Sequence, residues 1–180
     1  MSNAKIWNGA AYVDVPGKSR AGAGADRFRL GYWNGSAYVY VWEKPMPYQV
    51  NTTSNISGSG TSYNGWGSGS PTVSSGYPYT ILDSGIRIPA LCPAFTAVVR
   101  AQGDHSGGIS PRYTQLRLKQ NGTVIAEGAQ STGSPGTASV ESSVITIQPG
   151  DLITAEWRGE GQFFSRPALQ SGAWLRVTPQ

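Results

Sequence analysis

Apolar and polar residues alternate with a period of two along the second half of the chain, which predicts β-strands and not helices. Gly, Pro, Asn or Asp residues bound the alternating segments, and no segment of useful length has the helical period. The segments are YTILDSGIRIP, AFTAVVRAQGD, YTQLRLKQNGTVIAEGAQ, ASVESSVITIQPGDLITAEWRGEG and AWLRVTPQ. We therefore predict that residues 77–180 form an all-β domain, an antiparallel two-sheet sandwich of the jelly-roll type.

Two turns are predicted inside this domain from their residue types. Asn121-Gly122 lies between two alternating runs and suits the positive φ angles of a two-residue hairpin turn. Pro149-Gly150-Asp151 separates the apolar runs VITI and LIT, so we predict that it closes a second hairpin. Both turns mark points at which an antiparallel chain reverses.

The first 50 residues contain a duplicated unit. WNGAAYVDV begins at Trp7 and WNGSAYVYV begins at Trp33. In each copy Asn-Gly precedes an alternating run, which predicts a hairpin with a two-residue turn and an Ala-x-Val-x-Val face. An isolated hairpin is only marginally stable in water, so each unit needs another surface to lie against.

We interpret residues 1–50 as a repeated-hairpin arm that attaches the chain to another protein. Strand addition supplies backbone hydrogen bonds, and two weak contacts on one chain reinforce each other through effective concentration. The basic loop PGKSRAGAGADRFRLG separates the copies; docking to an acidic partner and simple solvation both remain open for it. The candidate attachment residues are Trp7, Val13, Val15, Arg27, Arg29, Trp33, Val39 and Val41.

Residues 51–76 are almost entirely Ser, Gly, Thr and Asn, a composition that buries too little apolar area to offset chain entropy. The larger residues that interrupt it, Ile56, Tyr63, Trp66 and Val73, are too sparse for a core of their own. Two interpretations stay open, a flexible linker and an extended arm draped over the sandwich.

Composition narrows the classes of function. The formal net charge is +4 with 13% charged residues, and the scattered Lys and Arg residues do not indicate specific nucleic-acid binding. One cysteine, Cys92, and one histidine, His105, give neither an internal disulfide nor a zinc-binding set, and we expect no cofactor. No run approaches the roughly 20 apolar residues of a membrane-spanning helix, so we expect no membrane insertion.

Catalytic motifs are weak. Asp104, His105 and Ser106 have the residue types of a hydrolytic triad, but three adjacent residues on one loop do not give the relay geometry. Glu156 and Glu160 stay open as a glycosidase pair, although solvated charges at a strand end explain them better. No phosphate-binding loop, zinc spacing or nucleophile elbow is present, and we expect the protein not to be an enzyme.

The order of strands in residues 77–180 resembles the jelly roll of the tumour-necrosis-factor and complement globular-head superfamily. The resemblance rests on Asn121-Gly122 after a leucine-alternating strand, on the apolar strand that ends in Pro149-Gly150-Asp151, and on the final strand at Trp174-Leu175. It implies a homotrimer about the jelly-roll axis.

The Trp-Asn-Gly-Ser-Ala-Tyr-Val units resemble segments near the ends of bacteriophage tail and accessory structural proteins. This resemblance implies a virion protein, made in the host cytoplasm without a signal peptide, whose partners are capsid or tail proteins. We expect a non-enzymatic structural protein of the head or tail surface. The alternative is an adhesin that binds host-cell glycans by stacking on aromatic residues. The candidate stacking residues are Tyr63, Trp66, Tyr77, Tyr79 and Tyr113.

Overall fold

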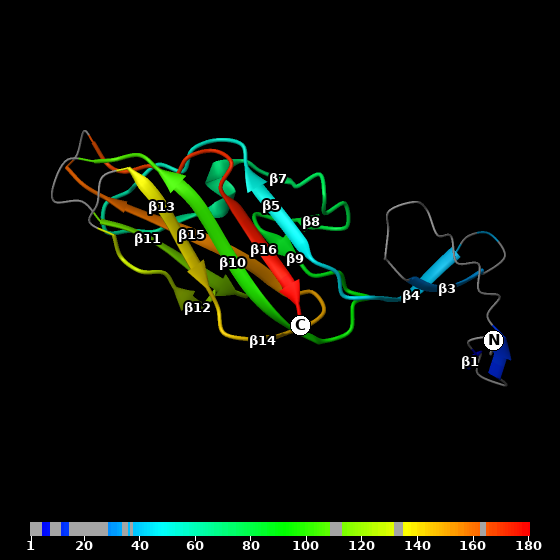
Figure 1. Ribbon diagram of the computed structural model, residues 1–180. Helices are drawn as coiled ribbons and strands as arrows, with labels where there is room; N and C mark the ends of the chain where they lie inside the picture. Colours follow the sequence, from blue (N-terminus) through cyan, green and yellow to red (C-terminus); the bar gives the residue numbers. More distant parts are fainter. Residues whose placement is uncertain are drawn as a thin grey trace.

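The protein is an antiparallel β-sandwich with an N-terminal extension, as the computed structural model shows (Figure 1). The structure describes residues 5–7, 12–14, 29–33, 36, 38–108, 113–131, 135–162 and 165–180. Its regular elements are β-strands and one short 3-10 helix. The prediction of an all-β, two-sheet sandwich is confirmed.

The first sheet has the strand order β13-β10-β16-β5-β7, and β14 pairs with β10 beside β13. Along β10 the buried residues Ala97, Val99 and Ala101 alternate with more exposed residues, most of them polar, that face outward. One side of this sheet therefore enters the core and the other faces solvent. The bounds are β5 Tyr48–Thr52, β7 Pro71–Val73, β10 Phe95–His105, β13 Gly136–Glu141, β14 Ile145–Ile147 and β16 Trp174–Pro179.

The second sheet has the order β12-β11-β15-β9-β8, and the short strand β6 pairs with β15. Burial alternates along β15 in the same way, with Ile153, Ala155 and Trp157 in the core. The two inner faces meet in one hydrophobic core. The bounds are β6 Asn64–Gly65, β8 Ile81–Leu82, β9 Ile86–Arg87, β11 Tyr113–Gln120, β12 Thr123–Glu127 and β15 Leu152–Glu160.

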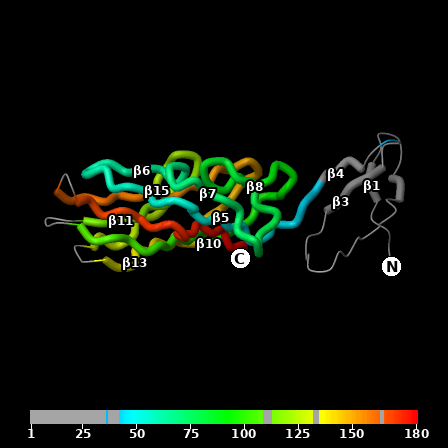
Figure 2. Tube along the Cα trace, turned by 90° about the horizontal axis from the view of Figure 1, so that it is seen from above, coloured from blue at the N-terminus to red at the C-terminus, as the bar shows by residue number. Residues whose placement is uncertain are grey.

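The Ser/Gly-rich segment 51–76 belongs to the sandwich. Ile56 and Trp66 are fully buried, and Ile56 exchanges two backbone hydrogen bonds with Leu169, at 2.8 and 2.9 Å. Strand β6 and the 3-10 helix η1, Trp66–Gly69, follow, and Figure 2 shows β6 running beside β15. Of the two open interpretations, the draped arm is therefore the one that the structure supports, and the flexible linker is wrong.

The sandwich also begins earlier than residue 77. Strand β5 lies between β16 and β7 in the first sheet, and its first residue Tyr48 and central residue Val50 have no exposed surface. The predicted boundaries at 50 and 76 therefore cut through the domain, which starts at Tyr48. Sparse apolar residues are enough here because each lies over a core that the longer strands already form.

Glycines permit this close approach of the draped segment. A Cβ atom at Gly159 of β15 would lie 2.1 Å from the Pro167 carbonyl oxygen and 3.0 Å from the Cα of Gly58. Three backbone segments pack against each other at this point without intervening side chains. The high glycine content of the draped segment is thus a packing requirement as well as a source of turns.

The two predicted turns have different outcomes. Asn121 and Gly122 have φ angles of 51° and 83° and join β11 to β12, so this hairpin is confirmed. The turn at Pro149-Gly150 instead joins β14, in the first sheet, to β15, in the second. It is an arch between sheets and not a hairpin, because the apolar run before it pairs with β10.

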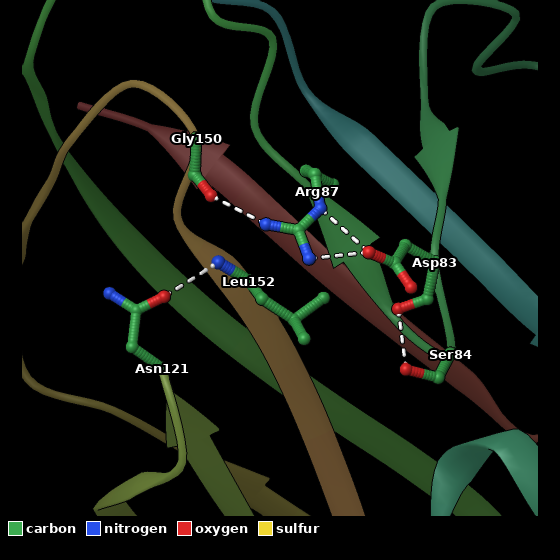
Figure 3. Close-up of polar contacts among 6 residues, drawn as sticks. All are labelled: Asp83, Ser84, Arg87, Asn121, Gly150 and Leu152. Atoms are coloured by element: carbon green, nitrogen blue, oxygen red, sulfur yellow. Dashed lines mark hydrogen bonds and ion pairs between the residues drawn. The ribbon is translucent and has the colours of Figure 1, made fainter.

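Polar contacts hold these turns together at one end of the sandwich (Figure 3). Arg87 bonds Asp83 and donates from Nη1 to the Gly150 carbonyl oxygen at 2.9 Å, while Asn121 Oδ1 accepts the Leu152 N–H at 2.9 Å. The buried Asp151 carboxylate accepts hydrogen bonds from Gln120, Asn121 and the Gln148 N–H. The arch and the hairpin are therefore tied to each other through Asp151.

The duplicated units form two separate two-stranded sheets, β1-β2 and β3-β4. Trp7 pairs with Tyr12 and Trp33 pairs with Tyr38, so each copy has four residues between its paired ends. The predicted two-residue Asn-Gly turn would have paired the tryptophan with the third residue after it, and that register is wrong. The bounds are β1 Lys5–Trp7, β2 Tyr12–Asp14, β3 Arg29–Trp33 and β4 Tyr38–Glu43.

Candidate functional site

The candidate attachment residues lie on the two hairpins wherever the structure describes them. Trp7 ends β1, Val13 lies in the middle of β2 opposite Ile6, and Arg29 begins β3 opposite Glu43. Trp33 ends β3, and Val39 pairs with Tyr32. Val15 and Arg27 lie outside the described residues.

The second copy differs from the predicted Ala-x-Val-x-Val face at one position. Leu30 pairs with Trp42 and Gly31 pairs with Tyr40, so Val41 of β4 lies opposite no residue of β3. A bulge of this kind bends the strand and changes the alternation of side chains across it. The backbone register is therefore not continuous from Val39 to Val41.

A backbone hydrogen bond joins the end of the second hairpin to the sandwich. The Glu43 N–H at the end of β4 donates to the Leu91 carbonyl oxygen at 3.0 Å, and Glu43 itself is buried. Strand β5 begins five residues later, beside the last strand β16, at the end of the sandwich where the C-terminus lies (Figure 1). The chain thus enters the sandwich at a fixed point.

The candidate stacking aromatics are in several different environments. Trp66 is fully buried in the core, so it offers no ring to a glycan, and that candidate is wrong. Tyr63 is half-buried: Arg117 lies 3.7 Å from its ring centroid, and its hydroxyl donates to Gln115 at 2.6 Å. Tyr77, Tyr79 and Tyr113 are half-buried, the first two in the segment between β7 and β8 and the third at the start of β11.

The three residues of the triad motif point in different directions. His105 is buried against Trp157 with the ring centroids 5.5 Å apart, and its Nδ1 lies 3.1 Å from the Ser106 carbonyl oxygen. Asp104 faces outward and accepts a hydrogen bond from Thr137, while Ser106 Oγ accepts the Ala168 N–H. The relay geometry that a serine hydrolase needs is not formed by these residues.

Both glutamates of the possible glycosidase pair have cationic partners. Glu156 accepts from Arg117 Nε at 2.6 Å and from Lys119 Nζ at 3.1 Å, and Glu160 accepts from Arg158 at 2.5 Å. A shallow hollow of about 290 Å³ lies next to Glu156, between η1 and β15. Within the described part of the chain, no group of three or more His, Cys, Asp or Glu residues could hold a metal ion.

Sequence analysis missed two residues on the outer face of the first sheet. Trp174 and Arg176 of β16 are half-buried, and Arg176 lies 4.9 Å from the Trp174 ring centroid and 5.4 Å from that of Tyr77. The signal was present in the sequence AWLRV. Leu175 and Val177 are core residues, so strand alternation places Trp174 and Arg176 together outside.

Comparison with known proteins bears on the fold. No protein-family model matches the chain, and no curated protein matches it. Among solved structures, Eiger TNF from S. frugiperda is similar with a TM-score of 0.53 and 11% identity, covering 75% of this chain and 92% of its own. The fold is a TNF-like jelly roll. The expected likeness to the tumour-necrosis-factor superfamily is confirmed at the level of the fold. None of the helices in the described residues is long and apolar enough to cross a membrane.

Proposed function

We propose that this chain is a non-enzymatic structural protein of a bacteriophage virion, attached to the head or tail surface by its N-terminal hairpins. One observation carries the proposal: the duplicated unit folds into two hairpins of the same register, and neither is a strand of the sandwich sheets. Two similar hairpins outside the main core suit a two-point attachment. The resemblance of these units to segments of phage structural proteins is the reason for proposing a phage particle as the surface to which they attach.

In this proposal the hairpins attach to the particle and the jelly roll projects from its surface. The chain enters it beside Glu43 and Leu91, and strand β10 runs for 11 residues from that end to the other. A rod of this kind holds its far end away from the attachment surface. We further propose that the sandwich assembles as a homotrimer, which the TNF-like fold supports.

Removal of the hairpins tests the attachment. Deletion of residues 1–41 keeps Glu43 and β5, whereas a cut at residue 50 would remove most of a central strand. We expect the shortened protein to keep its thermal transition and to lose about tenfold or more of its occupancy on phage particles. A matched control is Val144→Asp, which changes an exposed residue of the sandwich, 59% accessible, and leaves occupancy unchanged.

Two results would contradict the proposal. Undiminished occupancy of the 1–41 deletion on particles would place the attachment in the sandwich. A single monomeric species in sedimentation equilibrium of the full chain, at all concentrations, would contradict the homotrimer.

A second candidate function is saccharide binding by the sandwich, as in a host-recognition adhesin. The observation that favours it is the half-exposed group of Tyr77, Trp174 and Arg176 on one sheet face. Aromatic rings and planar polar groups are the usual partners of sugar rings in binding sites. Binding of the purified chain to a glycan array separates this candidate from a purely structural role.

A further inference from the structure

The outer face of the first sheet brings together an arginine, two aromatic rings and two amides. Arg176 lies opposite Gln49 of β5 in the strand register, and Trp174 lies opposite Asn51. Tyr77 reaches the same place from the segment after β7, since the Arg176 guanidinium lies 5.4 Å from its ring centroid. We name this group of five side chains the Arg176 cluster.

The hydrogen bonds within the Arg176 cluster run in one direction. A guanidinium can only donate, so the 2.6 Å contact between Arg176 Nε and Gln49 Oε1 fixes the orientation of the Gln49 amide. Gln49 Nε2 must then donate, and it does so to Asn51 Oδ1 at 2.9 Å. Each amide oxygen therefore accepts one hydrogen bond from within the cluster, and the Asn51 amino group remains as a donor.

The cluster consequently offers more unpaired donors than acceptors. Within the described residues, no acceptor is in hydrogen-bond contact with Arg176 Nη1 or Nη2, Trp174 Nε1, the Tyr77 hydroxyl or Asn51 Nδ2. Each of these side chains is only half-buried, so the donors are within reach of solvent. A ligand rich in oxygen acceptors is the complement of such a surface.

The positive charge of Arg176 indicates that the ligand is an anion. Arg87, Arg100, Arg117 and Arg158 each form an ion pair with a carboxylate within the described part of the chain. Arg176 has two aromatic rings and an amide in place of a carboxylate. Its positive charge is thus left available to an anion, and its two terminal nitrogens suit bidentate contact with a carboxylate or phosphate.

We propose that the Arg176 cluster binds an anionic saccharide. The carboxylate or phosphate of the sugar pairs with Arg176, the apolar face of the sugar ring packs against Trp174 or Tyr77, and sugar hydroxyls accept from Asn51. This inference extends the saccharide-binding candidate by naming a site and a ligand charge. It does not depend on attachment to a particle, because the purified full chain is enough to test it.

Titrations of the purified full chain test the site by following the tryptophan indole N–H signals in NMR. The probes are an oligomer of glucuronic acid, a hexose 6-phosphate and a neutral glucose oligomer. We expect the Trp174 signal, assigned by its absence in Trp174→Phe, to shift with an acidic probe and much less with the neutral one. Whichever acidic probe binds more tightly identifies the charged group.

Two variants sharpen the test. Arg176→Gln should weaken binding of the acidic probe about tenfold or more, and Arg176→Lys should recover only part of it because the bidentate contact is lost. Arg117→Gln is the matched control. Arg117 also lies over a tyrosine ring, that of Tyr63, but on the second sheet and away from the Arg176 cluster. Binding by Arg117→Gln should equal that of the unchanged protein.

Three results would overturn the inference. Equal binding of neutral and acidic probes would remove the role of charge, and unchanged binding by Arg176→Gln would place the site elsewhere. If no probe shifts the Trp174 signal and Arg176→Gln alters the sedimentation coefficient, the face is instead an interface between copies of this chain. That last result would not contradict attachment through the N-terminal hairpins, so failure of the saccharide site can be distinguished from failure of the attachment proposal.

Discussion

The two outer faces of the sandwich carry the same pair of residue types in different surroundings. On the β11–β15 face, Arg117 lies over Tyr63, and Glu156 accepts from the same arginine at 2.6 Å. On the β16–β5 face, Arg176 lies near the rings of Trp174 and Tyr77, and no carboxylate of the described residues forms an ion pair with it. One face is closed by its own side chains, and the other retains binding capacity.

The difference comes from the strands that lie beside each arginine. Arg117 pairs across the sheet with Glu156 of β15, so its charge is compensated by its direct neighbour. Arg176 pairs with Gln49 on one side and with Arg100 on the other, and Arg100 is already bound to Glu141. An arginine–tyrosine contact therefore stabilises a draped segment on one face and leaves a cation available on the other.

Trp66→Ala should have the largest effect on this comparison, because it loosens the segment that covers the closed face. Trp66 belongs to that segment and its side chain is fully buried in the core, and loss of a buried Trp costs about 3–5 kcal/mol. A chain of this size should then unfold roughly 10 °C lower. Chemical denaturation measures the change, and Val73→Ala, at a residue 37% exposed in the same segment, should change little. Equal effects of both variants would contradict the draped-segment packing.

Gly159→Ala tests the backbone contact under the same segment. The added Cβ atom would lie 2.1 Å from the Pro167 carbonyl oxygen, and backbone must shift to admit it, which costs about 1–3 kcal/mol. Gly65→Ala is the control, since nothing lies within 4 Å of its added Cβ atom and its φ angle is −70°. Limited proteolysis should cut the draped segment faster in Gly159→Ala than in Gly65→Ala. Equal rates would show that the contact does not hold the segment in place.

The sequence predicted the sandwich well where strands are long and alternate regularly. Along β10 and β15 every second residue is buried, so the period of two alone identified the core faces. It left residues 51–76 undecided between two interpretations, because single buried residues such as Ile56 and Trp66 carry no period of their own. Their burial depends on distant partners such as Leu169, which a local pattern does not contain.

The same reason explains the partial success at the candidate site. Tyr77 was named from the sequence, but its partner Arg176 lies about a hundred residues further along the chain and reaches it only through the pairing of β16 with β5. The predicted hairpin at Pro149 is wrong because turn residues do not specify which sheet receives the next strand. Both the Tyr77–Arg176 contact and the arch depend on which strands pair in the folded chain, and the local sequence does not contain that information.

Asp151→Asn tests the hydrogen bonds that tie the arch between the two sheets to the Asn121 hairpin. The stability that they contribute should depend on pH. Burial would raise the pKa of Asp151, but the Gln148 N–H and the Asn121 and Gln120 side chains outweigh it, and the pKa falls below its ordinary 3.8. The carboxylate therefore stabilises the fold above about pH 4, and this contribution is lost as the pH falls through the lowered value. Denaturation at several pH values should show Asp151→Asn less stable by about 1–2 kcal/mol at pH 7. The difference should shrink in acid, and a constant difference would contradict the assignment.

The smallest expected effect on stability comes from replacing each of the two arginines, and it compares them directly. Arg117→Gln removes a half-buried ion pair and a ring contact, so we expect a loss of about 1 kcal/mol that becomes smaller in high salt. Arg176→Gln removes ring contacts and one hydrogen bond but no ion pair, so its loss should be about 0.5 kcal/mol and independent of salt. Denaturation of both variants in low and high salt measures the contrast. A salt-dependent loss for Arg176→Gln would mean that this arginine is already paired with an anionic group in the free protein, and the two faces would then be alike.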